Sequence, residues 1–464
     1  MAYNSNFHPL LYKPMEVSGY WDESNSWHDG CYLNSSLNSP VPVHEIEGPD
    51  AEKFLEKYIV NSLENRPVGK GFHAVFCNDE GKIVADGIVV KRGEHKYRAY
   101  LIMMIGILAQ MEAGNFDIKV TELTGTLVLY QFCGPRALEL MEAVTGTDLH
   151  SLKFMCYAET SIDGMPVDIL RVGMAGTLGY EIHCRMEDSV KVYQKVMTEG
   201  EKYGLRHLGW QTYRNAHTEG GFPQSSVHYW YADYMHATDG LLGQRDCPEK
   251  PGAVSLAPPD ADPNDLLSIL STIYLDGSLS DEPFSAFTCT PYDVGWEKMI
   301  RFDHEFIGRS ALEAMRGQNT RTVVTLEWEP EDIAKVWNSV FEEGKPYKRM
   351  DLVADQEPYG EFEYFPSFNA TLPAGVYMEF DRVYIGDQEI GFTSGRMFSP
   401  HYRKMISLAF IPRDQAKIGE EVEILWGNPG TRQIRIRAKI ARYPYVDQCR
   451  NEKMDVSAIP HGNN

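Results

Sequence analysis

Two short segments of the sequence carry ionisable side chains of types that can do chemistry. Residues 179–182 contain the carboxylate of Glu181, and residues 213–222 contain the phenol of Tyr213 and the carboxylate of Glu219. A carboxylate can accept two parallel hydrogen bonds from neighbouring N–H groups. A phenol can donate a hydrogen bond or a proton to an oxygen that gains charge during a reaction. Together, groups of these types could hold a ligand with neighbouring N–H donors and act on an oxygen atom beside it.

Other common catalytic patterns are missing from the sequence. It contains neither a GxxxxGK[ST] loop nor a GxGxxG loop that follows a strand, so nucleotide-dependent chemistry is not indicated. The eight cysteines are scattered singly and no pair has CxxC spacing, which argues against a zinc knuckle or a thioredoxin-type site. No set of His, Asp and Glu residues has a spacing that requires a metal. We therefore expect a site without a metal.

The charge balance limits the partners of the chain. Its 464 residues include 44 basic and 66 acidic side chains, which gives a formal net charge of −22. A surface this negative repels phosphate backbones and anionic membranes, so neither nucleic acid nor a membrane is an expected partner. The sequence has no signal-like N-terminus and no apolar run long enough to span a bilayer. The scattered cysteines suit a reducing compartment, and we expect a cytoplasmic protein.

The elements that must position these residues indicate an α+β core with an internal duplication. Residues 43–51 and 129–137 each predict a strand, a Gly-Pro turn and the start of a helix. In both copies apolar residues follow at helical spacing. Two such units predict a core built from two related half-domains.

The rest of the chain predicts a long irregular insertion followed by strands. Residues 186–203 predict an amphipathic helix that ends at Gly204. Its expected inward side chains are Val190, Tyr193, Val196 and Met197. Residues 225–291 contain Pro258, Pro259 and Pro263 and predict a loop region. Beyond residue 320 the pattern is that of an all-β domain, so we predict domains at residues 1–320 and 321–464. Its expected strands are residues 322–328, 374–380, 389–393, 406–411, 421–426 and 433–441.

Three groups of motifs resemble the glycine-cleavage aminomethyltransferases. Residues 393–400, Thr-Ser-Gly-Arg-Met-Phe-Ser-Pro, are similar to the T-S-G-x-x-S-P signature of that family's C-terminal barrel, with one extra residue. Residues 303–312 are similar to the D-F-I-G-[KR]-x-A-L segment ahead of the barrel. Residues 179–182 and 217–222 are similar to the G-x-E-I and R-x-E-[AG]-G pair of the folate-binding core. The resemblance implies an α+β folate-binding core of duplicated subdomains followed by a C-terminal β-barrel.

Within this family the sequence is more similar to tetrahydrofolate-dependent aromatic O-demethylases of the vanillate and syringate type. Residues 290–309 and 172–182 resemble these enzymes, and Tyr213 stands where glycine-cleavage enzymes usually have Arg. The resemblance implies a one-carbon transferase with tetrahydrofolate as its cofactor. It would move a methyl or methylene group from an aryl ether to N5 of the folate.

The resemblance also implies residue roles. Glu181 would accept the adjacent N–H donors of the pterin ring, and Tyr213 would hydrogen-bond to and protonate the departing phenolate oxygen. Asp86 is the second of two tandem positions that are usually Asp in the family, and Ala85 occupies the first. Asp86 is thus a candidate catalytic acid, with a simple turn residue as the equal alternative.

Further residues complete the predicted site. Glu219 joins Glu181 in the implied folate-binding set, together with Arg396, whose basic group could meet the carboxylates of the folate tail or lie at the surface. The predicted substrate pocket contains Ile102, Phe222 and Tyr292. An aromatic run at Tyr229, Trp230, Tyr231 and Tyr234 could cover a flat ring or be core.

Two departures from the vanillate-type enzymes bear on the substrate. Residues 37–40 contain no His where those enzymes are His-rich, and residues 100–104, the segment in which those enzymes have an Arg, contain Ile102 and two Met residues instead. An Arg there would suit a carboxylated aromatic. We therefore expect a neutral methoxy- or methylenedioxy-arene, unless Arg98 supplies the cation.

Two alternatives stay open. One is an amine or sulfonium demethylase on the same fold, which the missing first Asp and the presence of Tyr213 disfavour. The other is a non-catalytic folate-binding protein of iron–sulfur maintenance, whose K-G-C-[YF]-x-G-Q-E hallmark is absent. The exact substrate, the choice between methyl and methylene transfer and the assembly state, with a homodimer as one option, are left open.

Overall fold

The computed structural model describes residues 14, 16–36, 41–102, 104–173, 177–225, 227–232, 245–246, 253–255, 272–353, 376–447 and 450–462. The chain forms two compact units. The first combines Met1–Ala216, Lys298–Glu313 and Asp447–Asn464, and the second combines His217–Glu297 and Ala314–Val446. Because both units are discontinuous in sequence, the domain boundary near residue 320 stays a prediction.

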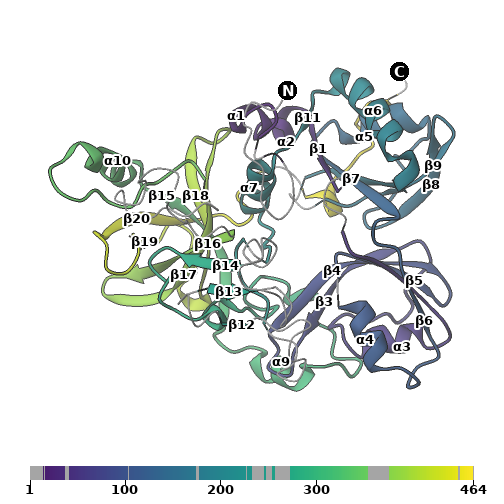
Figure 1. Cartoon of the computed structure of the whole chain (residues 1–464), viewed down its shortest axis with the longest axis horizontal. Helices are drawn as coiled ribbons and strands as arrows, with labels where there is room; N and C mark the ends of the chain where they lie inside the picture. The colour runs from purple at the N-terminus through teal and green to yellow at the C-terminus, as the bar shows by residue number, and fades with distance from the viewer. Residues whose placement is uncertain are drawn as a thin grey trace. The chain divides into compact units, whose positions relative to one another are not determined.

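The first unit contains a five-stranded and a six-stranded sheet (Figure 1). The five-stranded sheet has the order β3-β4-β5-β2-β6. Its strands are β2 (Val43–Glu47), β3 (Gly71–Cys77), β4 (Ile83–Gly93), β5 (Lys96–Tyr100) and β6 (Lys119–Glu122). The six-stranded sheet has the order β11-β1-β7-β10-β9-β8. Its strands are β1 (Cys31–Ser35), β7 (Leu127–Cys133), β8 (Tyr157–Ile162), β9 (Met165–Leu170), β10 (Gly179–Arg185) and β11 (Leu205–His207).

The helices of the first unit accompany these sheets. They are α1 (Tyr20–Glu23), α2 (Ser26–Asp29), α3 (Ala51–Glu56), α4 (Ile105–Met111), α5 (Ala137–Thr145) and α6 (Ser189–Gly200). Two more, α7 (Trp210–Gly220) and α9 (Arg309–Met315), begin in the first unit and end in the second. The helix predicted at residues 186–203 is confirmed, but its inward face is wrong at Val190, which is 54% exposed, whereas Val192 is buried. Tyr193, Val196 and Met197 pack against the core as predicted, and Val192 takes the inward place expected for Val190.

The predicted duplication is confirmed by the two sheets. In each, a strand ends in Gly-Pro, a helix follows, and a three-stranded meander returns to pair with the first strand. Gly48 and Gly134 both have a φ of +142°, and a Cβ at either position would lie 2.3 or 2.4 Å from a backbone oxygen. Only glycine tolerates both conditions. The two residues before the helices, Asp50 and Arg136, share a φ of −100°.

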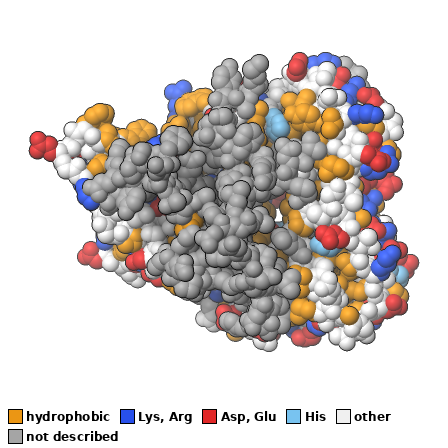
Figure 2. Space-filling model, in the orientation of Figure 1, with side chains coloured by type: hydrophobic (Ala, Val, Ile, Leu, Met, Phe, Trp, Pro, Cys, Tyr) orange, Lys and Arg blue, Asp and Glu red, His pale blue; other side chains and the backbone are white. Residues whose placement is uncertain are grey.

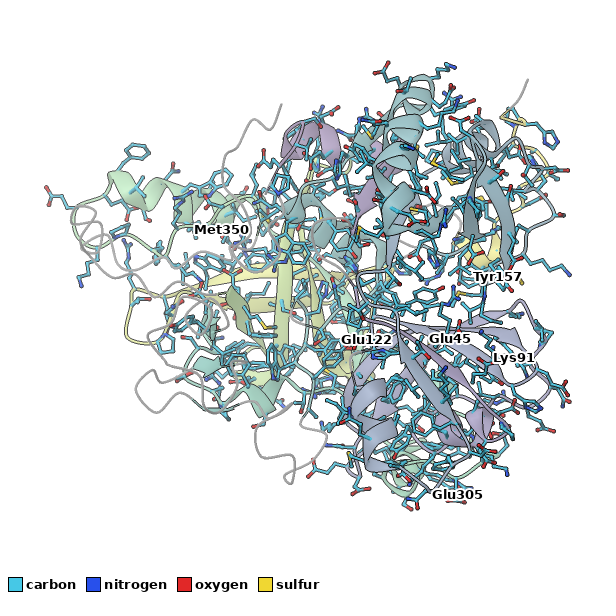
Figure 3. All side chains as sticks on the ribbon, turned by 45° about the vertical axis from the view of Figure 1, so that its right-hand side comes forward. Glu45, Lys91, Glu122, Tyr157, Glu305 and Met350 are labelled. Atoms are coloured by element: carbon cyan, nitrogen blue, oxygen red, sulfur yellow. The ribbon has the colours of Figure 1, made fainter. Side chains whose placement is uncertain are left out.

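Each face of the six-stranded sheet has its own partner. Tyr130, Tyr180 and Ile182 point into a core with α5 and α6. The opposite face meets the five-stranded sheet through an apolar cluster. Its buried members are Val43, Val90, Tyr100, Leu129, Met155, Leu170 and Val172. This apolar cluster therefore joins the sheets of the two half-domains. Glu45, from the five-stranded sheet, and Tyr157, from the six-stranded sheet, are labelled in Figure 3.

The second unit is built on a closed six-stranded barrel, which confirms the predicted β-barrel. The barrel order is β16-β17-β18-β15-β20-β19, and β19 pairs with β16 to close it. The strands are β15 (Arg321–Trp328), β16 (Val376–Ile385), β17 (Gln388–Ser399), β18 (Lys404–Pro412), β19 (Glu421–Trp426) and β20 (Ile434–Ala441). Short strands β12 (Arg245–Asp246), β13 (Ala253–Ser255) and β14 (Thr272–Asp276) extend the sheet beyond β16. Helix α10 (Pro330–Asn338), which the sequence pattern did not predict, follows β15.

The Thr-Ser-Gly motif of the barrel is a structural turn. Gly395 has a φ of +61°, and a Cβ there would lie 2.5 Å from Nε2 of His228. The flanking Ser394 donates a hydrogen bond to the carbonyl oxygen of His228 at 2.8 Å, and Thr218 donates one to the carbonyl oxygen of Gly395 at 2.8 Å. The motif thus anchors the segment around His228 to the barrel.

Two surface properties follow from the described residues. On the face drawn in Figure 2, their Lys and Arg side chains are interspersed with Asp and Glu and form no continuous basic patch. No helix among the described residues is both long and apolar enough to span a membrane.

A cluster in the first unit brings together side chains of metal-ligand type. The ligand atoms of Glu142, Asp148, His150 and His461 lie within 4.8 Å of one another. Both ring nitrogens of His150 have partners, since Nδ1 lies 2.8 Å from Glu142 and Nε2 donates to the carbonyl oxygen of Ile459 at 2.9 Å. Burial opposes charge on this ring, but the two hydrogen bonds prevail and raise the pKa of His150. The cluster ties the C-terminal segment to α5 as an ion pair.

Candidate active site

Glu181 lies on the face of β10 that looks toward the five-stranded sheet. Residues of a strand alternate between its faces, and neighbours in register share a face. Glu181 is in register with Leu170, which belongs to the cluster between the sheets. It is also in register with Gln131 of β7. Two strands therefore present a carboxylate and an amide side by side between the half-domains.

Each oxygen of the Glu181 carboxylate has one hydrogen-bond partner. Nε2 of Gln131 donates to Oε1 at 3.2 Å, and Nε2 of His183 lies 2.9 Å from Oε2. The Glu181 side chain keeps 13% of its surface exposed. Because a carboxylate has about four acceptor positions, two remain for a ligand.

The amide oxygen of Gln131 is the second group that could accept a hydrogen bond from a ligand. Gln131 is 7% exposed, and its buried Oε1 accepts no hydrogen bond from the described residues. A buried acceptor without a donor costs about 1–3 kcal/mol. An N–H donor of a ligand next to Glu181 would remove that cost. The pair therefore fits a ligand with adjacent N–H groups, as a pterin has.

Tyr213 lies within electrostatic reach of Glu181, so the structure brings the two central predicted residues into one region. Burial, followed by the nearby Glu181 carboxylate and Cys133, raises the pKa of Tyr213 well above 10. The phenol is therefore neutral over the physiological range. A raised pKa makes Tyr213 a hydrogen-bond donor, while full transfer of its proton to a phenolate of ordinary pKa becomes uphill.

Apolar and aromatic side chains form a wall behind Tyr213. The wall consists of Trp27, Tyr32, Cys133, Leu208 and Ala216, and Tyr213 packs against it. The ring of Trp210 lies 5.8 Å from that of Tyr213 and is tilted by 32°. Burial is also the largest cause of the raised pKa of Tyr32. These contacts fix the phenol in a low-dielectric setting, where one hydrogen bond to a developing charge is strong.

Asp86 is paired with a histidine that sequence reasoning missed. Its Oδ2 lies 2.6 Å from Nε2 of His73 across the β3–β4 pairing, and both side chains are largely buried. The backbone around His73 is held by Asn61, which donates to the carbonyl oxygen of His73 and accepts from the N–H of Val75. Asp86 is therefore a strand residue hydrogen-bonded to a histidine, not a turn residue. Its catalytic role stays a prediction.

Ile102 is fully buried next to Gly87. A Cβ on Gly87 would lie 2.6 Å from the Ile102 side chain. Because Gly87 and Asp86 are consecutive in β4, they point to opposite faces of the sheet. Ile102 thus packs on the face opposite to Asp86. This favours a core position, and its role in a substrate pocket stays a prediction.

Three predicted residues lie in the second unit. Glu219 is fully buried near the end of α7, and the N–H of Val446 donates to its carbonyl oxygen. The ring of Phe222 lies 5.6 Å from that of Trp296. Tyr292 is 8% exposed, and burial is the largest cause of its raised pKa. None of these observations tests a role in binding, so the roles of the three residues stay predictions.

Arg396 is enclosed by the barrel. It is 2% exposed, and its Nε donates to Glu379 at 3.1 Å. Its remaining N–H groups face the carbonyl oxygens of Asp351 and Val353, and the guanidinium lies 4.8 Å from the ring of Trp426. These contacts give Arg396 a structural role within the unit. Its predicted contact with a folate tail stays a prediction.

Several expected features lie outside the described residues. They are residues 37–40, Met103, Tyr234, Pro258, Pro259 and Pro263.

Comparisons with known proteins decide the family. The GCVT N-terminal domain model matches residues 39–233, and the glycine cleavage T-protein C-terminal barrel domain model matches residues 370–447. The chain is similar to the sesamin methylene transferase of Sinomonas sp. (strain No.22), with 34% identity over 451 residues, covering 96% of this chain and 93% of that protein. This chain belongs to the glycine-cleavage T-protein family.

Other family members agree with this result. The syringate O-demethylase of Sphingobium sp. (strain NBRC 103272 / SYK-6) is 27% identical over 470 residues, covering 95% of this chain and 92% of that protein. The crystal structure of aminomethyltransferase T from Bartonella henselae matches with a TM-score of 0.62 at 16% identity, covering 94% of this chain and 92% of that chain. That structure supports the fold alone. The chain is a one-carbon transferase of the T-protein family, a family that generally depends on tetrahydrofolate.

Proposed function

We propose that this T-protein family member binds tetrahydrofolate and transfers to it a methyl or methylene group from a neutral aryl ether. The observation that carries the proposal is the placement of the Tyr213 phenol beside the Glu181 carboxylate. A group that can hold a pterin and a group that can act on an aryl oxygen thus share one water-poor zone of the first unit.

Glu181 and Gln131 are the residues that would hold the folate. The two open acceptor positions of Glu181 and the buried Oε1 of Gln131 suit the adjacent N–H donors of a pterin edge. When bound, tetrahydrofolate supplies the nitrogen nucleophile that takes the carbon. Glu181 and Gln131 orient the ligand, and the aromatic wall keeps water away from it.

Tyr213 is the residue that would act on the leaving oxygen. As the bond between the ether oxygen and carbon lengthens, negative charge grows on that oxygen. The neutral phenol donates a hydrogen bond to it and lowers the barrier, since the charge develops in a buried environment. Because the Glu181 charge helps to raise the pKa of Tyr213, N–H donors that offset this charge make the phenol a better acid.

The cations near this zone favour a neutral substrate. Arg98 donates to Glu45 at 2.8 Å and lies 3.7 Å from Asp168. Arg92 donates to Asp168 at 2.8 Å. Both guanidinium groups are thus engaged within the protein and are poor partners for a substrate carboxylate. The 34%-identical relative is named for methylene transfer and the 27%-identical one for demethylation, which supports methoxy- and methylenedioxy-arenes as the substrate class.

The test is anaerobic incubation of the protein with tetrahydrofolate and a panel of neutral and carboxylated methoxy- and methylenedioxy-arenes. The expected products are a phenol or catechol together with 5-methyl- or 5,10-methylene-tetrahydrofolate. Dimethylglycine and dimethylsulfoniopropionate serve as competing substrates. Turnover of either one without turnover of any aryl ether would refute the proposal.

Tyr213→Phe tests the residue assignment. We expect kcat to fall roughly 100- to 1000-fold, as for loss of a proton-handling or charge-stabilising group, with folate affinity little changed. Tyr130→Phe is the matched control, because it removes a buried tyrosine hydroxyl that donates to the carbonyl oxygen of Ser189 on the other face of the sheet. Full activity of Tyr213→Phe would exclude the role given to this phenol.

A further inference from the structure

A chain of hydrogen bonds reaches Glu181 from the other half-domain. Nε2 of His183 lies 2.9 Å from Oε2 of Glu181, and Nδ1 of His183 lies 3.0 Å from the hydroxyl of Tyr100. Burial raises the pKa of the Tyr100 hydroxyl, and the charge of Arg98 on the same strand opposes that rise. Tyr100 and Arg98 belong to β5 of the five-stranded sheet, whereas His183 and Glu181 belong to β10 of the six-stranded sheet.

The direction of these bonds follows from the groups involved. A carboxylate has no proton to donate, so Nε2 of His183 carries the proton and donates to Glu181. In the tautomer with this Nε2 proton, Nδ1 accepts from the Tyr100 hydroxyl at 3.0 Å. Both donors then point toward Glu181. Hydrogen bonds aligned in this way strengthen one another in a buried environment.

The members of the chain have little freedom to move. His183 is 4% exposed and Tyr100 is 2% exposed. Their rings are in contact, with centroids 4.6 Å apart. Arg98 is anchored by Glu45. A carboxylate held at one oxygen by such a chain cannot rotate freely about its last torsion.

We propose that His183 is a positioning residue for folate binding, held by Tyr100 so that Glu181 presents its open acceptor positions to the pterin. This inference rests on the proposed function, because it takes Glu181 as the folate-binding carboxylate. It assigns to the contact between the half-domains a direct part in cofactor affinity. His183 acts through Glu181 and does not itself touch the reacting atoms.

The test measures the dissociation constant of 5-methyltetrahydrofolate by isothermal titration calorimetry for the full-length protein and its variants. We expect His183→Leu to weaken binding about 10- to 50-fold, the range for loss of a hydrogen bond to a charged group. His183→Gln keeps an N–H donor of similar reach and should recover most of the affinity. Tyr100→Phe should weaken binding by a smaller factor, about 3- to 10-fold, because the ring of His183 stays in place.

His150→Leu is the matched control. It removes an imidazole from another His–Glu pair of the same unit, the one with Glu142 at 2.8 Å. This variant should lose thermal stability and keep its folate affinity. A role of His183 in stability alone would give the same result for His183→Leu, and that outcome would overturn the inference.

A double variant separates positioning from independent contact. If His183 acts only through Glu181, then Glu181→Gln combined with His183→Leu binds folate no more weakly than Glu181→Gln alone. If the two single losses of folate affinity multiplied in the double variant, His183 would act independently of Glu181, which would contradict the positioning role. Weak binding by Glu181→Gln with normal binding by His183→Leu and Tyr100→Phe defeats this inference and leaves the proposed function intact. If Glu181→Gln binds folate normally, the proposed folate site fails, and the inference fails with it.

Discussion

Glu181 in the first unit and Arg396 in the second both stand in motifs that resemble the same family, yet their surroundings differ. Arg396 is 2% exposed, and its N–H groups face the carboxylate of Glu379 and backbone oxygens. Glu181 keeps 13% of its side chain exposed and has the open amide oxygen of Gln131 beside it. A charged group whose hydrogen-bonding positions are all occupied within the protein stabilises the fold. A charged group with positions left open can receive a ligand, and motif similarity alone does not tell the two apart.

The barrel network around Arg396 shows how closed such a cluster is. Nζ of Lys348 donates to Asp276 at 2.6 Å and to Glu379 at 3.1 Å, and all three side chains are at most 8% exposed. Burial opposes the Lys348 charge, but the surrounding acids prevail and raise its pKa. Asp381 adds a third acid to the two cations. The network therefore has one more acid than base, and all of its side chains are buried.

The largest expected effect is on the buried ion-pair network around Arg396. Arg396→Met should lower the free energy of unfolding by about 3–5 kcal/mol, because it removes one partner of a buried ion pair. Denaturant unfolding measures this loss, and folate affinity of the folded fraction should stay unchanged. Normal stability combined with weak folate binding would instead support the predicted contact between Arg396 and the folate tail.

The second effect depends on pH. Burial, followed by the charge of Glu379, raises the pKa of Asp381 to about 7. Because this pKa is higher in the folded than in the unfolded protein, the stabilisation is complete below about pH 4 and is lost as pH rises toward 7. The loss is at most about 1.4 kcal/mol for each pH unit in that window.

Asp381→Asn should remove this slope. Asparagine imitates the protonated acid and can still accept the N–H of Ser278, which lies 2.8 Å from Oδ1 of Asp381. Unfolding curves at pH 5, 6, 7 and 8 compare the two proteins. An unchanged slope in the variant would assign the pH dependence to other groups.

The smallest expected effect concerns the buried amide oxygen of Gln131, which has no donor among the described residues. Gln131→Leu should weaken folate binding about 5- to 10-fold and change the free energy of unfolding by less than about 1 kcal/mol, because the loss of a buried acceptor without a donor offsets the loss of the hydrogen bond to Glu181. Calorimetric titration and thermal unfolding measure the two quantities. A loss of stability with unchanged folate affinity would make Gln131 a structural residue like Arg396.

Sequence patterns predicted the parts of this protein that depend on local order. The Gly-Pro turns at Gly48 and Gly134, the barrel strands and the helix at 186–203 follow from turn chemistry and periodicity. The α10 helix was missed although Pro330 stands at its first turn and acidic residues follow, a signal that could have found it.

The site was predictable only in part, for a physical reason. Glu181 and Tyr213 were named through short motifs, and the structure places them together. Gln131, His183 and Tyr100 were missed because their roles depend on strand register and on the contact between two sheets. Tyr100 and His183 are far apart in sequence, and nothing in either segment alone indicates their hydrogen bond.

The two half-domains share one ancestral pattern of strand, turn and helix, but their contributions to Glu181 are unequal. One half carries the carboxylate, and the other carries the tyrosine that steadies it. Because each half-domain supplies one member of this interaction, a substitution in one half-domain affects the function of the other. Residues at positions 100 and 183 should therefore covary among relatives, and a relative without a tyrosine at position 100 should hold its carboxylate through a different contact.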